Sequence, residues 1–338
     1  MNKVLIIGGG LSGCVMTRIL LDENVEVDLV EKNSKLGGMC TDYYDKNAQI
    51  YVNKYGAHIW HFDEDSEKHW DWISQFGRWK GYEHKVMCLG NGNFTYWPIN
   101  RTYSKVHKFL GGKKIDDEFI DSYSRKMWGD DYDDVMGSIK KRFEPKGSMS
   151  NKFFGDEKQY ILCSGFSNLC NDLVKGANVK LETQIHYDIT LFKKYDYVIL
   201  TGGLDDFYYG GEGKLKYKGI EFTKEVIMCD GNILPTPVLN LNTNKKYLRV
   251  VEYNQFYDND SHYRVLVKEE PSNKTSFYPV LSVKQKEKYA EYVKVNEAHS
   301  NGKIKLLGRL AKYKYLDMDE VLVECFELKK ELKDEKKL

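Results

Sequence analysis

The chain has no excess charge of either sign and no apolar run long enough to span a membrane. Its 51 Lys and Arg residues face 50 Asp and Glu residues, for a net charge of +1. Such a balance creates no overall field that would attract nucleic acid or an acidic membrane. The first apolar run is short and breaks on glycine, which is typical of a strand rather than a signal sequence. We therefore expect a soluble, cytoplasmic protein with no nucleic-acid or membrane partner.

Paired cysteines and the usual patterns of metal ligands or nucleophiles are also missing. The seven cysteines are scattered without a C-x-x-C pair, which is typical of free thiols in a reducing compartment. His58 and His61 lie three residues apart, but no further cluster stands at ligand spacing, so we expect no metal. No Ser-His-Asp or Cys-His arrangement and no acid–base pair of carboxylates is evident. Any chemistry must then come from a cofactor.

The strongest positive pattern lies in the first forty residues. The apolar run at 4–7 predicts a buried parallel strand, and Gly8, Gly10 and Gly13 form G-x-G-x-x-G directly after it. A helix-prone stretch follows, and then a second strand that ends in Glu31. The order of strand, glycine turn, helix, strand and acid is the dinucleotide fingerprint. The glycines let the backbone approach a pyrophosphate, the helix N-terminus stabilises its charge, and Glu31 holds a ribose hydroxyl.

A second glycine pair, Gly37-Gly38, follows closely. It resembles the continuation seen in FAD-binding oxidases and mutases, which nicotinamide dehydrogenases usually lack, and so favours FAD over NAD. The 338 residues suffice for two or three domains with their own cores. The 25 tyrosines suit stacking on rings and hydroxyl contacts to phosphates or sugars, although most must simply pack half-buried.

The rest of the chain alternates between strand and helix patterns. We expect hairpins over 39–53 and 86–97, helices over 67–76, 104–142, 168–175, 284–301 and 318–328, and strands over 179–181, 197–200, 220–225, 238–241, 248–253, 263–268 and 303–307. The buried strand at 197–200 ends in glycines and would return the chain to the cofactor domain.

With the glycine fingerprint, Tyr55-Gly56-Ala57-His58-Ile59-Trp60-His61 resembles the characteristic loop of the UDP-galactopyranose mutase family. Further blocks follow in the family's order: Pro98-Ile99-Asn100, the stretch from Phe119 to Gly129, the stretch from Asn151 to Leu169, and Gly308-Arg309-Leu310-Ala311-Lys312-Tyr313-Lys314-Tyr315-Leu316-Asp317-Met318. The resemblance runs from Val4 to Phe326, and the order of the blocks is more specific than any one motif.

The resemblance implies an α/β fold in three parts. These are a Rossmann-like FAD-binding domain with a parallel sheet (1–82, 165–206 and 282–338), a reduced helical domain with a mobile loop (101–143), and an antiparallel-sheet substrate domain (83–100, 144–164 and 207–281). The helical domain is shorter than is usual in the family. The missing turns carry much of the dimer contact in bacterial members, so the homodimer that the family implies stays open.

The resemblance also implies the reaction and its partners. We expect reversible isomerisation of UDP-galactopyranose to UDP-galactofuranose, by covalent catalysis through N5 of reduced FAD. UDP-galactose and UDP would be the ligands, and the product would serve galactofuranose biosynthesis for a cell wall or surface polysaccharide. No net redox change occurs, so a reductant such as NAD(P)H is needed only to activate the cofactor.

The family's functional residues carry over position by position. Arg142 and Arg249 would bind the diphosphate and His61 would lie by flavin and sugar, as the catalytic set. The residues implied to contact the substrate are Asn100, Phe119, Tyr123, Trp128, Lys158, Tyr278, Tyr315 and Asp317. Those implied to contact FAD are Gly8, Gly10, Ser12, Gly13, Glu31, Lys32, Gly38, His58, Arg309 and Met318.

Some of these assignments have a physical reason of their own. Phe119 and Tyr123 stand four residues apart on one helix face, where both rings can stack on a flat base such as uracil. Arg142 follows Trp128 by fourteen residues, at the spacing of the family's mobile-loop arginine, and a guanidinium fork suits a diphosphate. Lys158 departs from the family, which often has a tyrosine there that contacts the substrate phosphates.

Three other functions stay open. A mutase for a related sugar, such as UDP-N-acetylgalactosamine, would keep the mechanism and change the sugar pocket. An FAD-dependent amine oxidase or desaturase would share the first forty residues, but the later blocks argue against it. A non-catalytic nucleotide-sugar binder would fit the short helical region and Lys158.

Overall fold

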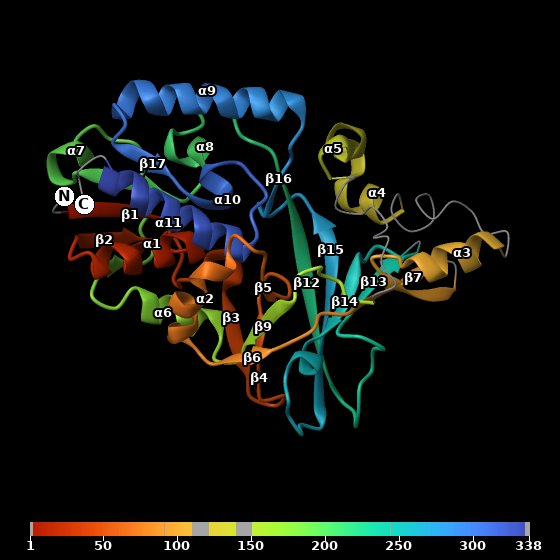
Figure 1. Cartoon of the computed structure of the whole chain (residues 1–338). Helices are drawn as coiled ribbons and strands as arrows, with labels where there is room; N and C mark the ends of the chain where they lie inside the picture. Colours follow the sequence, from red (N-terminus) through yellow and green to blue (C-terminus); the bar gives the residue numbers. More distant parts are fainter. Residues whose placement is uncertain (1–2, 91, 110–121, 140–150, 244, 335–338) are drawn as a thin grey trace.

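The structure is a computed structural model, and it describes residues 3–90, 92–109, 122–139, 151–243 and 245–334. Within these ranges the chain forms a parallel sheet wrapped in helices, which holds both termini, and a larger, mostly antiparallel sheet beside it (Figure 1). The predicted fold class, α/β with a Rossmann-like parallel sheet and an antiparallel sheet, is confirmed. The predicted domain boundaries stay a prediction.

Three separate stretches of the chain supply the parallel sheet. In order across it, the described strands are β10 (Asn178–Lys180), β2 (Glu26–Val30), β1 (Lys3–Ile7), β11 (Tyr197–Leu200) and β17 (Ile304–Leu306). The helices around it are α1 (Leu11–Asp22), α6 (Phe166–Leu173), α7 (Leu191–Lys194), α8 (Leu204–Phe207), α9 (Val283–Ser300), α10 (Gly308–Ala311) and α11 (Met318–Asp334).

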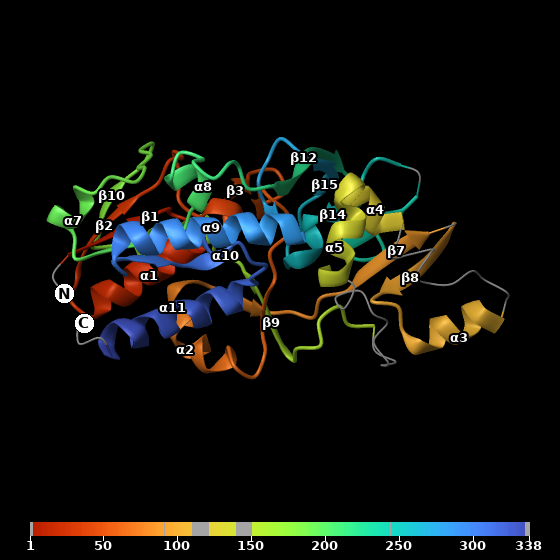
Figure 2. The same ribbon diagram turned by 90° about the horizontal axis from the view of Figure 1, so that it is seen from above.

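The alternation of side chains along β1 explains why helices cover both faces of the sheet. Val4 and Ile6 join one core cluster with residues of α1, α6 and α11. Leu5 and Ile7 join the opposite cluster with residues of α8 and α9. An unbroken apolar strand therefore has two apolar faces to bury, as parallel sheets require. Seen from above, α9 runs across the parallel sheet, while α11 runs along one side of the domain (Figure 2).

The larger sheet carries the second half of the site. Its described strands, in order, are β16 (Tyr278–Pro279), β12 (Tyr217–Met228), β15 (Tyr263–Ser272), β14 (Arg249–Glu252), β13 (Val238–Asn242), β7 (Val86–Gly90) and β8 (Asn93–Trp97). One pair departs from the expected antiparallel pattern, because β13 lies parallel to β7. A long stretch of chain separates these two strands, so no tight turn forces them to run in opposite directions.

The remaining described elements lie outside these two sheets. They are the hairpin of β3 (Asp42–Asp45) and β4 (Ile50–Asn53), the small sheet of β5 (Trp60–Phe62), β9 (Lys158–Leu162) and β6 (Trp79–Gly81), the helices α2 (Trp70–Ile73), α3 (Arg101–Phe109), α4 (Ser122–Trp128) and α5 (Tyr132–Ile139), and 3₁₀ turns at Gly38–Cys40, Glu67–His69, Ser74–Phe76, Gly129–Asp131 and Tyr253–Phe256.

The helix expected over 67–76 is broken into α2 and two flanking 3₁₀ turns, although Ile73 is buried as its pattern predicts. The two hairpins predicted at 39–53 and 86–97 are confirmed. In the parts of the chain that the structure describes, no helix combines the length and apolar character that crossing a bilayer requires.

Candidate functional site

The turn between β1 and α1 is shaped by close approaches that only glycine permits. A Cβ on Gly13 would lie 1.9 Å from the Gly8 carbonyl oxygen, so the third glycine lets α1 pack against the end of β1. Gly8 has φ +109°, and its carbonyl oxygen accepts a hydrogen bond of 3.0 Å from Thr201 Oγ1. No side chain caps α1 at Gly10. The N–H groups of its first turn are therefore left for an anionic ligand.

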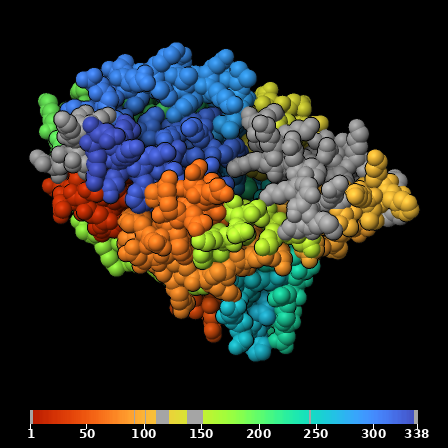
Figure 3. All heavy atoms as spheres, viewed as in Figure 1, coloured from red at the N-terminus to blue at the C-terminus, as the bar shows by residue number. Residues whose placement is uncertain are grey.

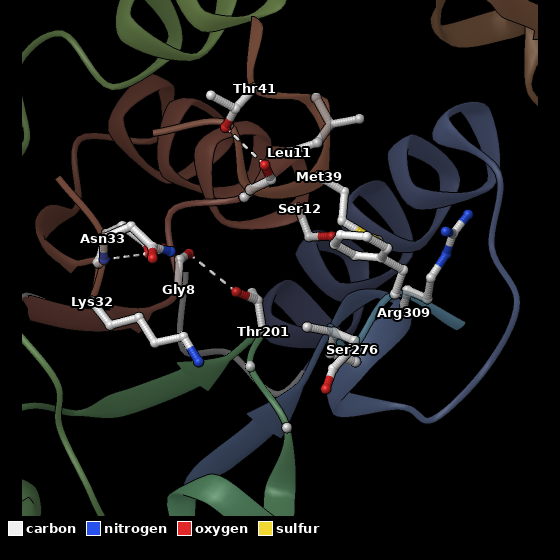
Figure 4. Close-up of a pocket in the computed structure, with 18 of the residues that line it drawn as sticks. Gly8, Leu11, Ser12, Lys32, Asn33, Met39, Thr41, Thr201, Ser276 and Arg309 are labelled. Carbon is white, nitrogen blue, oxygen red and sulfur yellow. Dashed lines mark hydrogen bonds between the residues drawn. The ribbon is translucent and has the colours of Figure 1, made fainter. Parts of the chain in front are cut away.

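Glu31, at the end of β2, holds this loop from the other side. Its buried carboxylate accepts hydrogen bonds from the backbone N–H of Gly9 at 2.7 Å and of Asn33 at 2.8 Å. The acid of the fingerprint thus fixes the glycine turn from within the chain. Figure 4 shows Gly8, Asn33 and Thr201 together at one end of the pocket.

The second glycine pair lies directly against the first. Gly37 N–H donates to the Gly9 carbonyl oxygen at 2.8 Å, and a Cβ on Gly38 would lie 2.9 Å from the Gly10 Cα. Thr41 Oγ1 donates to the Gly38 carbonyl oxygen at 2.7 Å. The two glycine motifs therefore form the two sides of one cradle made of main-chain atoms, and few side-chain atoms lie between these two sides.

A cavity of about 1050 Å³ opens over this cradle. Nine of the ten residues predicted to bind the cofactor line it, namely Gly8, Gly10, Ser12, Glu31, Lys32, Gly38, His58, Arg309 and Met318. Gly13 is the exception, because it packs beneath the loop. Lys32 Nζ lies 3.5 Å from the carboxylate of Asp206, a lining residue on α8 that was not predicted.

The far end of the cavity is built by residues from both halves of the chain. Arg309 Nε donates to the Leu316 carbonyl oxygen at 3.1 Å, which anchors the guanidinium next to the start of α11. In Figure 4, Arg309, Ser12 and Met39 lie together at this end. Burial, reinforced by the charge of Arg309, lowers the pKa of His58 to about 4. His58 is therefore a neutral imidazole near neutral pH.

Two predicted residues lie where α11 begins. The Met318 Sδ is 3.9 Å from the Cys40 Sγ. The Asp317 carbonyl oxygen accepts the first hydrogen bond of α11, from Val321 at 3.0 Å, and its N–H donates to the Glu320 carboxylate at 2.6 Å. Asp317 thus stands at the N-cap position of α11, and it also lines the cavity.

Arg249 on β14 is the centre of a second group of predicted residues. It lies opposite Glu269 on β15 and Asn240 on β13, and its Nε is 3.2 Å from the buried Glu269 carboxylate. Its Nη2 donates to the Tyr123 hydroxyl at 2.7 Å. Burial alone would lower the pKa of Arg249, but Tyr123, Glu269 and Tyr278 outweigh it and raise that pKa. The guanidinium therefore stays charged.

Aromatic rings link this group to the cavity. The Tyr315 ring centroid lies 5.9 Å from that of Tyr278 and 6.4 Å from that of Trp128. The Arg309 guanidinium carbon is 5.9 Å from the Tyr278 ring centroid. Because Arg309 also lines the cavity, the residues grouped around Arg249 lie next to the residues predicted to bind the cofactor. We name the group of Tyr123, Trp128, Arg249, Tyr278 and Tyr315 the arginine cluster.

His61 on β5 lies near the arginine cluster. Its Nδ1 is 2.7 Å from the Asp156 carboxylate, and its ring stacks on Phe154 with centroids 3.9 Å apart. Burial, reinforced by Arg249 and His61, lowers the pKa of His84 to about 3. His84 thus stands within electrostatic reach of both.

The remaining predicted residues lie elsewhere. The Asn100 side chain accepts the Tyr103 N–H at 2.9 Å, as a cap of α3, and donates to Asn151. Lys158 on β9 pairs with Glu67 and does not line the cavity. Phe119 and Arg142 lie outside the described residues, so their predicted roles stay predictions.

Sequence reasoning missed Glu269, Asp156 and Asp206. Glu269 is one of two consecutive acids in a strand, and nothing local indicates that it faces Arg249. Asp156 stands in a loop and meets His61 only because β9 pairs with β5. Contacts between residues so far apart in sequence leave no local pattern to find.

Comparison with known proteins defines the class first. Residues 6–76 match the model of an NAD(P)-binding Rossmann-like domain, which agrees with the glycine cradle described above. The model described as UDP-galactopyranose mutase matches residues 118–315, more than half of the chain. The chain belongs to the UDP-galactopyranose mutase family, a family of mutases and hence of isomerases.

Curated relatives align over nearly the whole chain. A dTDP-fucopyranose mutase of Escherichia coli is 26% identical, with 97% of each chain covered. A probable UDP-galactopyranose mutase of Klebsiella pneumoniae is 24% identical, covering 96% of this chain and 93% of that one. A UDP-galactopyranose mutase of Mycoplasma genitalium is 26% identical, covering 95% and 92%.

Solved structures support the fold. A crystal structure of reduced UDP-galactopyranose mutase superimposes with a TM-score of 0.72 at 13% identity, over 97% of this chain and 93% of that chain. A putative protoporphyrinogen oxidase from Exiguobacterium superimposes with a TM-score of 0.67 at 11% identity, over 99% of both chains.

Proposed function

We propose that the protein interconverts UDP-galactopyranose and UDP-galactofuranose with the help of reduced FAD. The observation that carries the proposal is the arginine cluster beside the cavity: a half-buried, charged guanidinium is hydrogen-bonded to a tyrosine, and its cluster borders a cavity over a backbone cradle suited to a dinucleotide. One site then binds the cofactor and the other binds a second diphosphate. Membership of the mutase family and three mutases among the relatives support this reading.

The residues of the cavity fit FAD. The first turn of α1 offers uncapped N–H groups to a pyrophosphate, and Gly38 leaves room that any side chain would fill. Among the described residues, the buried Nδ1 of His58 has no hydrogen-bond partner and belongs to a ring that lines the cavity. Glu31 would hold the ribose, and Arg309 the pyrophosphate. Reduced FAD, when bound, would supply N5 as the nucleophile towards the anomeric carbon.

The arginine cluster would bind the nucleotide part of the substrate. Arg249 would hold the diphosphate as its charge develops during cleavage of the anomeric bond, and Tyr278 and Tyr315 would donate to its oxygens. Tyr123, with Phe119, would stack on the base. Because Glu269 fixes the guanidinium before the substrate arrives, little reorganisation is needed when the charge appears.

The sugar would lie between the cluster and the cavity. His61 and Trp128 would orient it there, so that the anomeric carbon faces the cofactor. We further propose that Arg142 closes over the diphosphate, that NAD(P)H or a similar reductant activates the flavin, and that the reaction itself leaves the flavin's redox state unchanged.

The relative that acts on a dTDP-sugar makes dTDP-fucose a second candidate substrate. It is as similar to this chain as the Mycoplasma UDP-galactopyranose mutase, at 26% identity. Both substrates share a nucleoside diphosphate and a hexopyranose, so the arginine cluster serves either. UDP-N-acetylgalactosamine is a third member of the same substrate class.

The test is an anaerobic incubation of the dithionite-reduced protein with each nucleotide furanose, followed by chromatography of the products. We expect conversion of UDP-galactofuranose to the pyranose, and no conversion by the oxidised protein. Conversion of dTDP-fucofuranose alone would move the assignment to the second candidate. A flavin-loaded, reduced protein that converts none of these sugars would refute the proposed function.

A further inference from the structure

A carboxylate and an aromatic ring hold His61 from two sides. Asp156 Oδ2 lies 2.7 Å from His61 Nδ1, and the Phe154 ring stacks on the imidazole with an interplanar angle of 23°. Both Asp156 and Phe154 come from the segment that leads into β9. Strand β9 pairs with β5, and in this pairing Gln159 lies opposite His61. This segment reaches the surface beside the segment of residues 60–80 (yellow-green beside orange in Figure 3).

The backbone that carries Asp156 is itself fastened in place. Gln159, which is only 3% exposed, donates from Nε2 to the Asp156 backbone carbonyl oxygen at 2.9 Å. Its Oε1 accepts the backbone N–H of His84 at 2.8 Å. Phe153 N–H in turn donates to the His84 carbonyl oxygen at 2.9 Å. Loop 153–157 is therefore tied to the chain before β7, and Asp156 has little freedom to leave His61.

A carboxylate can only accept hydrogen bonds, so a short contact to it requires a hydrogen on His61 Nδ1. In a neutral imidazole the other nitrogen, Nε2, then carries a lone pair. The further charged or titratable groups near His61 are Asp63 on its own segment, Asp319 on α11 and the neutral His84. Apart from Asp156, the described residues show no ion pair to His61 within 4 Å.

We propose that Asp156 is a positioning residue that holds His61 in the Nδ1–H form and so makes Nε2 the ring atom offered to the sugar or the cofactor. The role of His61 in this inference rests on the proposed function, but the assignment of its tautomer does not depend on that function. Gln159 and Phe154 complete this arrangement: Gln159 fixes the backbone at Asp156, and Phe154 fixes the plane of the His61 ring.

The chain contains its own matched control. His262 Nδ1 lies 2.6 Å from the Asp230 carboxylate, which is the same chemical pair at nearly the same distance. There the side chains are 76% and 86% exposed, against 14% and 27% for His61 and Asp156. Water competes freely for the exposed pair, so its carboxylate should impose no fixed tautomer.

The first experiment reads the tautomer by ¹⁵N NMR of protein labelled on its eight histidines, at a pH well above the usual histidine pKa. The His61 signal is assigned by its loss in His61→Gln. We expect the Nδ1–H pattern in the wild type and a shift to mixed or Nε2–H populations in Asp156→Asn. Asp230→Asn should leave the His61 signal unchanged. A wild-type His61 with hydrogen on Nε2, or an unchanged pattern in Asp156→Asn, would overturn the proposal.

The second experiment separates positioning from mere folding. Asp156→Asn should keep its flavin and lower kcat roughly 10- to 100-fold, the usual cost of losing a partner that orients a functional histidine. KM should change little, and Asp156→Glu, which restores an acceptor, should recover part of the loss. A fall in stability or flavin content that accounts for the whole loss, without recovery in Asp156→Glu, would contradict the proposal. If the wild type proves inactive, the proposed function fails, while the NMR result still decides the tautomer.

Discussion

The two halves of the site are built in opposite ways. The cofactor cradle is local: Gly8 to Gly38 supply both of its walls and Glu31 binds them together within one short stretch. The arginine cluster is assembled from distant parts of the chain, since Tyr123 and Arg249 are 126 residues apart in sequence. The same holds outside the cluster for His61, whose partner Asp156 is 95 residues away in sequence. The cradle presents backbone groups to the cavity, whereas the cluster consists of charged and aromatic side chains that are half-buried or buried.

This difference determines which substitutions each half of the site tolerates. A backbone cradle fails when bulk is added, because its neighbours are main-chain atoms that cannot move aside. A side-chain cluster fails when a charge loses its partner or its geometry, because a buried unpaired charge is costly. Steric changes should therefore act mainly on flavin binding, and changes of charge geometry should act mainly on turnover.

The largest effect is expected from Gly13→Ala. The new Cβ would lie 1.9 Å from the Gly8 carbonyl oxygen, so either α1 or the glycine turn must shift. We expect the purified variant to lack flavin absorbance and to lose about 3 kcal/mol of stability or more. Gly81→Ala is the control, since a Cβ there meets no atom within 4 Å. A Gly13→Ala protein that retains its flavin would contradict the proposal that the glycine cradle binds the cofactor.

Arg249→Lys should leave the flavin spectrum intact and lower kcat/KM by roughly 100-fold, because lysine keeps the charge but loses the planar fork that holds a diphosphate and Tyr123 at once. Steady-state kinetics of the reduced protein measure this. Arg264→Lys is the matched control, because Arg264 is a strand arginine whose Nε lies 3.9 Å from buried Glu252. Flavin loss in Arg249→Lys would mean that the two halves are not separable.

Acid should weaken the cradle through His58. Its folded pKa of about 4 lies below the ordinary 6.5, so its contribution to stability is complete above pH 6.5 and is lost as the pH falls to about 4. The depression corresponds to about 3 kcal/mol. Urea titrations over this pH range should show the loss in the wild type and a smaller loss in His58→Gln. An equal dependence of the unfolding free energy on pH in the two proteins would contradict the burial of a neutral His58.

The same contrast between local and distant contacts separates the features that the sequence predicted from those that it did not. The strands, both hairpins and nearly all cavity-lining predictions came from contiguous motifs, where glycine spacing and apolar runs report directly on backbone geometry. The partners Glu269, Asp156 and Asp206 were not predicted, because strand register and sheet order decide which side chains meet. The parallel pairing of β7 with β13 was missed for the same reason.

The smallest effect is expected from Asn100, which lies outside both halves of the site. Its side chain caps α3 through the Tyr103 N–H, so Asn100→Ala should lower the free energy of unfolding by about 1 kcal/mol. Asn100→Ser keeps a capping oxygen and should lose only a few tenths of a kcal/mol. Thermal unfolding separates the two variants. Equal losses in both would mean that the cap does not stabilise α3, and a raised KM in Asn100→Ser would support the predicted substrate contact.

The central claim is that one chain holds two diphosphates side by side, one in each half. A crystal structure of the FAD-loaded protein with UDP tests it most directly. We predict the FAD pyrophosphate at the first turn of α1 near Arg309, and the UDP diphosphate at Arg249 with the uracil ring against Tyr123. Electron density for UDP in the glycine cradle, or none at Arg249 when the crystal is saturated with UDP, would contradict the account.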